Sequence, residues 1–190
     1  MRKRGSLRWY RTVDLFLFTL MLLLFESVII VASTKWFPGQ PYTVSVVPAL
    51  VAILIIRWGP WAAIHALLGG ILVCVLSGAK SSQYVIYCVG NLFPLLLLPF
   101  LSRWRRDEGS IKKNVYALAL GLAVLLLIQI GRAVVSLFFG FTPVQALGYF
   151  TTDVITDLFT LIVLWIVRRL DGMLEDQAHY LNRIRDEEKT

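Results

Sequence analysis

The chain has 190 residues, 57% of them hydrophobic, with a net charge of +7 and a mean hydropathy of +0.70. Its longest polar segments are too short to bury a core of their own, which excludes a second soluble domain. The positive charge is explained by membrane topology and contact with anionic lipid, so we expect a membrane protein with no nucleic-acid partner.

Six apolar segments are predicted to be membrane-spanning helices, which makes the fold an all-α membrane bundle. The second segment is barely long enough to span without tilt or bilayer thinning. The fourth contains Pro94 and Pro99, and Gly140–Pro143 separates the fifth from the sixth. In chain order the segments cover residues 13–33, 42–56, 60–76, 84–101 and 115–139, with the sixth ending near residue 167.

The basic residues predict the orientation of these segments. Sixteen of the nineteen Lys and Arg residues fall at alternate ends of the predicted spans, and only Lys35 and Lys80 fall on the opposite side. The positive-inside rule therefore predicts both termini on the cytoplasmic side of the membrane. The expected regions are a basic N-terminus (1–11), a six-helix domain (12–170) and an amphipathic tail (171–190) that continues from the sixth span.

Four ionisable residues lie inside the apolar segments: Glu26, Arg132, Asp153 and Asp157. A charge in the bilayer centre costs at least a few kcal/mol unless it faces protein or water. The helical rise places these side chains and Asn91 at similar depths, roughly 9 to 15 Å below the outer ends of their helices. We expect them to meet in one layer in the outer half of the membrane.

Helical spacing puts further polar and aromatic residues on the same faces. Tyr149 precedes Asp153 and Asp157 at intervals of four, which places the three on one face of the sixth helix. We predict an outward-facing cavity that binds a small polar ligand with a flat ring. Its expected ligand-binding residues are Glu26, Trp36, Gln40, Tyr84, Tyr87, Asn91, Gln129, Arg132, Tyr149, Asp153 and Asp157.

Structural roles also explain several of these residues. Arg132 can pair with Asp153 or Asp157 as a salt bridge between helices, and Glu26 can be protonated and hydrogen-bonded in the bundle. One arginine cannot neutralise three carboxylates, however, so the layer keeps an acidic excess unless protons or a cationic ligand supply the difference. Ala62 and Ala66 form a small-residue stripe that can pack within this bundle or dock a partner protein.

The layout resembles the substrate-binding S component of an energy-coupling factor (ECF) vitamin transporter. The resemblance rests on the length, the six spans, the run Pro41–Pro48 before a short second helix, the turn Arg57-Trp58-Gly59-Pro60, and Gly90-Asn91 in the fourth segment. It implies a non-enzymatic subunit in the inner membrane of a bacterial cell, which binds a vitamin-like nutrient and works with a transmembrane coupling subunit and two ATPases. The first helix lacks the alanine stripe with which many relatives dock on the coupling subunit.

The leading hypothesis is therefore a binding subunit for uptake of a small, cationic or heteroaromatic nutrient, with no cofactor and no metal. Surrounding membrane lipid is its other expected contact. A structural scaffold of the MreD cell-shape type is the alternative. An intramembrane aspartyl enzyme is a weaker hypothesis, because Asp153 and Asp157 share one helix and cannot face each other.

Overall fold

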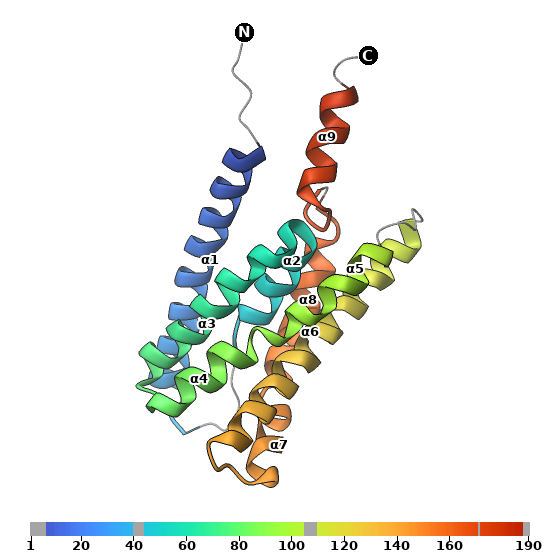
Figure 1. Ribbon diagram of the computed structural model, residues 1–190. Coiled ribbons are helices and arrows are strands. Elements are labelled where there is room, and N and C mark those ends of the chain that lie inside the picture. Colours follow the sequence, from blue (N-terminus) through green and yellow to red (C-terminus); the bar gives the residue numbers. More distant parts are fainter. Residues whose placement is uncertain (1–6, 40–43, 105–109, 171, 188–190) are drawn as a thin grey trace.

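The computed structural model describes residues 7–39, 44–104, 110–170 and 172–187, and every regular element within them is helical. Figure 1 shows the helices gathered in one bundle, with the start of α1 (Leu7–Trp36) and α9 (Gln177–Glu187) at the same end. Within these ranges, four helical stretches are long and apolar enough to cross a membrane, or five if one bent pair counts as a span. Large apolar side chains are exposed along α1, α6 and α8, as lipid-facing surfaces require. The chain is thus an all-helical membrane protein.

The centre of the bundle is α2 (Val47–Trp58), a helix whose twelve residues are all buried. A helix that is hydrophobic on every side has to be surrounded by other elements. Here α1, α3 (Ala62–Ser77), α6 (Ser110–Phe138) and α8 (Val154–Val167) pack around it. The short second segment predicted from the sequence is therefore a core helix.

The chain reverses direction between α2 and α3. Gly59 adopts φ +58, a conformation that favours glycine, and begins the short helix η1 (Gly59–Trp61). After the reversal, Gly69 of α3 lies against Val47 at the start of α2, so close that a Cβ on Gly69 would come within 2.5 Å of the valine side chain. Six separate crossings remain a prediction, because the stretch from Val47 to Ser77 meets the length criterion only as one run.

The fourth predicted span is present as one apolar stretch, Ser81–Leu101, but its α-helix is interrupted part-way. After α4 (Ser81–Gly90) come the 3₁₀ helix η2 (Phe93–Leu97) and α5 (Leu98–Trp104). Pro94 lies at the start of η2 and has no N–H to continue the α-helical hydrogen bonds. The break leaves Asn91 as the residue that ends α4.

The sixth predicted span is bent by 40° between α7 (Pro143–Thr152) and α8. The hydroxyl groups of Thr151 and Thr152 both donate to the carbonyl oxygen of Gly148, at 3.1 and 2.9 Å. Such back-bonding bends helices, and it comes directly before the break at Asp153. The tail contains the expected helix, α9, but this helix does not continue from the sixth span, since α8 ends at Val167.

Candidate functional site

Arg132 is the centre of the polar layer predicted from the sequence. It lies on α6 and is only 5% exposed. Its Nη1 donates to Asp153 Oδ2 at 2.8 Å, and its Nε and Nη2 donate to Asn91 Oδ1 at 3.1 and 2.9 Å. The bend between α7 and α8 and the end of α4 thus deliver two oxygen acceptors to one guanidinium group. Of the two alternatives left open by the sequence, Asp153 is the ion-pair partner.

Asn91 links this arginine to a third helix. Its Nδ2 donates to the backbone oxygen of Ala66 on α3 at 3.2 Å, while its Oδ1 accepts from Arg132. Both ends of the amide are engaged, so their bonding partners define its orientation. The side chain is 1% exposed and connects α3, α4 and α6.

One tyrosine ring lies over the guanidinium group, and a second tyrosine packs against the first. The Arg132 Cζ lies 4.5 Å from the centre of the Tyr87 ring, in cation–π geometry. Tyr149 meets Tyr87 edge to face, with ring centres 6.3 Å apart and an interplanar angle of 80°. These contacts confirm that α4, α6 and α7 turn predicted residues toward one another.

Two glycines allow α4 and α6 to approach closely enough for these contacts. A Cβ on Gly90 would lie 2.6 Å from Arg132 Cγ, and a Cβ on Gly131 would lie 2.6 Å from the Gly90 carbonyl oxygen. Small residues at such crossings let helix backbones approach in membranes. Gly131 is a site residue beyond those predicted, and its place beside an intramembrane arginine is the sequence signal that could have identified it.

Asp157 forms a second polar contact with α6. Gln129 Nε2 donates to both carboxylate oxygens, at 2.9 Å for Oδ1 and 3.0 Å for Oδ2. Gln129 is 3% exposed and Asp157 is half-buried. The amide satisfies part of the carboxylate's hydrogen-bonding capacity but brings no positive charge.

Glu26 is fully buried on α1. Its Oε2 accepts a hydrogen bond from the backbone N–H of Val46 at 2.8 Å, just before α2, whereas Oε1 has no hydrogen-bond partner among the described residues. A carboxyl group that is buried with one oxygen unsatisfied is energetically costly, which marks this position as unusual. Val46 is held against α1 by this bond.

The charges of the layer do not cancel within the described residues. Arg132 forms its ion pair with Asp153. Asp157 is bonded to an uncharged amide, and Glu26 to a backbone N–H. The excess of carboxyl groups over cations that the sequence predicts is therefore present among the described residues of the layer.

The remaining predicted residues lie apart from this network. Trp36, at the end of α1, is 74% exposed, and Tyr84 is half-buried on α4 one turn before Tyr87. Gln40 lies outside the described residues. Ala62 and Ala66 are fully buried, so their stripe packs against helices of this chain. The outward-facing cavity among the polar residues stays a prediction.

A second buried arginine was missed as a structural centre. Arg57, at the end of α2, donates from Nε and Nη2 to the two carboxylate oxygens of Asp14, both at 2.9 Å. Its Nη1 donates to the carbonyl oxygens of Gly172 and Met173, at 3.0 and 3.2 Å, and the Trp58 indole also donates to Asp14. The sequence signal that could have revealed this centre is Asp14, a lone carboxylate among the basic residues of the end expected to be cytoplasmic.

Comparison with known proteins gives no family assignment. No family model, no curated protein and no solved structure matched the chain.

Proposed function

We propose that the chain is a membrane-embedded binding subunit for uptake of a small cationic or heteroaromatic solute. The observation that carries the proposal is that two carboxyl groups of the layer, Glu26 and Asp157, have no cation as partner among the described residues, whereas Asp153 is paired with Arg132. In a low-dielectric environment such carboxylates favour a bound cation or proton over an empty site. The two tyrosine rings add surfaces on which a flat or cationic group can stack.

Each part of the layer has a role in this proposal. Asp157 and Glu26 attract the positive charge of the solute, while Tyr87 and Tyr149 contact its ring. The mutual bonds of Arg132 and Asn91 hold α4 and α6 in position around it. Glu26 is also bonded to the backbone at Val46, so occupation of the layer is coupled to the segment that precedes α2.

The arrangement of the helix ends supports a six-span topology for this subunit. The start of α1 and α9 lie at one end of the bundle, which requires an even number of crossings (Figure 1). The number of crossings is even, namely six, if α2 and α3, which are separated by the reversal at Gly59, each count as one crossing. Arg8, Arg57 and Arg168 then share the end expected to be cytoplasmic.

Energy for uptake would come from other proteins. The sequence contains no phosphate-binding loop of the GxxxxGK[ST] type, so ATP hydrolysis requires partner subunits. We propose a transmembrane coupling subunit and two ATPases in that role, as the resemblance to ECF S components implies. Fully buried Ala62 and Ala66 leave the outer faces of the helices as the candidates for docking.

The experiment that tests this function is native mass spectrometry of the chain after gentle extraction from its host membrane. We expect a co-purified, non-lipid molecule of low mass that is retained by the wild type and by a Tyr10→Phe control, whose ring is exposed near the start of α1. The Asp157→Asn variant, with the same shape but without the charge, should lose it. A wild-type protein that carries no such molecule and takes up none of a panel of vitamins added before extraction would contradict the proposal.

One observation favours a structural scaffold of the MreD type as a second candidate. The guanidinium group of Arg132 is bonded to Asp153 and Asn91 within the chain, as expected for a pair that fixes helix positions. A deletion strain separates the candidates: altered cell shape with normal nutrient uptake would support the scaffold. Normal shape with loss of uptake of one nutrient would support the binding subunit.

A further inference from the structure

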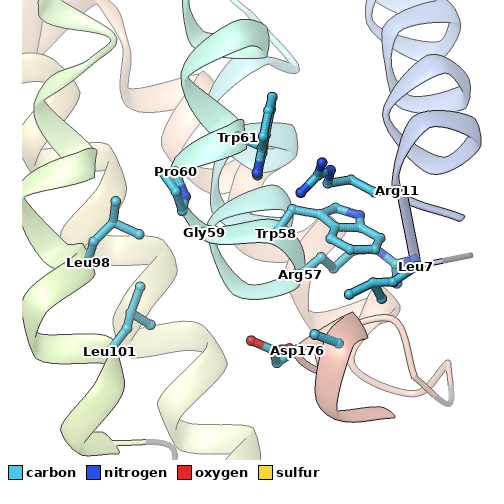
Figure 2. Close-up of a pocket in the computed structure, with 11 residues that line it drawn as sticks. Leu7, Arg11, Arg57, Trp58, Gly59, Pro60, Trp61, Leu98, Leu101 and Asp176 are labelled. Carbon is cyan, nitrogen blue, oxygen red and sulfur yellow. The ribbon is translucent and has the colours of Figure 1, made fainter. Parts of the chain in front are cut away.

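A cavity of about 330 Å³ lies at the end of the bundle opposite the polar layer. Four parts of the chain form its walls, which Figure 2 shows: the start of α1, the turn around η1, helix α5 and the start of α9. Its volume is at the lower end of the range for ligand pockets, roughly 300–1,000 Å³. The pocket lies at the end of the bundle where the basic residues gather, and none of the residues assigned to solute binding lines it.

Arg11 is the arginine in the cavity wall whose charge is available to a ligand. Its guanidinium group lies over the Trp61 ring, with Cζ 4.2 Å from the ring centre, and it makes no ion pair with the described residues. The other arginine in the wall, Arg57, is already paired with both oxygens of Asp14. Figure 2 shows Arg11 beside Trp58 and Trp61.

The wall also contains one carboxylate, Asp176. Its Oδ1 accepts from the backbone N–H of His179 at 3.0 Å and so caps the first turn of α9. This capping bond fixes the position of the start of α9 at the cavity.

The rest of the lining suits a molecule with an apolar part. Leu98 and Leu101 of α5 form one side of the cavity, and Pro60 and Leu7 contribute apolar surface elsewhere. Trp61 is 41% exposed. Tryptophans of this kind lie at the headgroup level of a bilayer, and basic pockets between transmembrane helices on the cytoplasmic side bind lipid headgroups.

We propose that this cavity is a binding site for one phospholipid of the cytoplasmic leaflet, with the lipid phosphate held by Arg11. The guanidinium group donates hydrogen bonds to the phosphate oxygens while it stays stacked on Trp61. The glycerol and the first acyl carbons lie along Leu98 and Leu101. Because α1, η1, α5 and α9 all border the site, the lipid connects the first and last helices of the chain.

The test is native mass spectrometry of the full chain in mild detergent with added phosphatidylglycerol as the probe. We expect the wild type to retain one lipid at collisional activation energies that remove the other bound lipids. Arg11→Gln should lower this retention about tenfold, the value for one lost charge-assisted hydrogen bond. Arg8→Gln is the matched control, because Arg8 is exposed one turn earlier and does not line the cavity.

A second arm separates lipid from free phosphate. Excess inorganic phosphate should not displace the retained lipid, since it cannot occupy the apolar wall. Trp61→Leu should weaken retention less than Arg11→Gln, because the cation remains. Equal lipid retention by the wild type and Arg11→Gln, or displacement of the lipid by inorganic phosphate, would overturn the proposal.

Discussion

Two buried arginines organise the two ends of this bundle, and they are neutralised differently. Arg57 forms paired bonds with both oxygens of Asp14 and two more with carbonyl groups of the tail. Arg132 forms a single bond with Asp153 and bonds with the uncharged amide of Asn91. The first centre is self-contained, whereas two further carboxyl groups of the second, Glu26 and Asp157, have no ion pair with any residue that the structure describes.

The difference separates a structural ion pair from a candidate binding layer. A bidentate pair leaves little hydrogen-bonding capacity unused, so Arg57 and Asp14 are expected to hold α1, α2 and the tail together. Around Arg132, the bonded partners come from the end of α4 and from the break between α7 and α8, and carboxyl groups outnumber cations among the described residues. Under the proposed function, a ligand that carries positive charge binds in this layer without breaking the ion pair.

The largest expected effect is that of Arg132→Gln on stability. The substitution leaves Asp153 buried without its cation, and breaking a buried pair costs about 3–5 kcal/mol. The free energy of unfolding in mixed detergent micelles measures this loss. The double variant Arg132→Gln/Asp153→Asn should recover a large part of it, and a double variant as unstable as the single one would show that the charge is not the cause.

Arg57→Gln is expected to have the next largest effect, centred on the tail. It removes charge-assisted hydrogen bonds that are worth about 1.5–3 kcal/mol each when they are well formed. Asp14 is partly exposed, with 20% of its side chain accessible, and water replaces some of the loss. Hydrogen exchange should accelerate in α9 and around residue 172. Unchanged protection of α9 would contradict the role given to this arginine.

The contact between α4 and α6 predicts a smaller effect for Gly131→Ala. The added Cβ would approach the Gly90 carbonyl oxygen to 2.6 Å, and overpacking costs about 1–3 kcal/mol. Gly148→Ala is the control, because no atom lies within 4 Å of its Cβ position on α7. Alanine there should be neutral or stabilising by about 0.5–1 kcal/mol. Thermal unfolding followed by circular dichroism compares the two variants, and equal melting temperatures would refute the close approach.

Asp157→Asn is expected to change stability least, by less than about 1 kcal/mol. Asparagine keeps an oxygen that accepts from Gln129, so one hydrogen bond is retained while the charge is lost. Thermal unfolding in the absence of added solute measures the difference. A loss as large as that of Arg132→Gln would mean that Asp157 has a structural role comparable to that of Asp153.

The sequence predicted the parts of the structure that depend on local pattern and burial cost. The long apolar segments predicted the helices. The cost of burying charge in lipid predicted, correctly, that Arg132, Asp153 and Asn91 lie together. Helical spacing also placed Tyr87 and Tyr149 on facing surfaces. These inferences succeeded because each depends on a single helix and its depth.

Other features depend on contacts between distant residues or on local competition for hydrogen bonds. The bend at Asp153 follows threonine hydroxyl groups that bond back to Gly148, and residue spacing alone does not reveal such bonds. The partnership of Arg57 with the tail joins residues more than a hundred positions apart. The complete burial of α2 was hidden because a short span and a core helix have the same apolar sequence.

The most direct test of the central claim compares three solutes that share one ring and differ in charge: nicotinate, nicotinamide and 1-methylnicotinamide. Thermal-shift measurements on the wild type, the Asp157→Asn variant and a Glu26→Gln variant would rank their binding. An acidic layer predicts that the cation stabilises the wild type most and that each substitution reduces this preference. A preference for the anion, or a ranking that neither substitution changes, would contradict the claim that Glu26 and Asp157 select a positively charged solute.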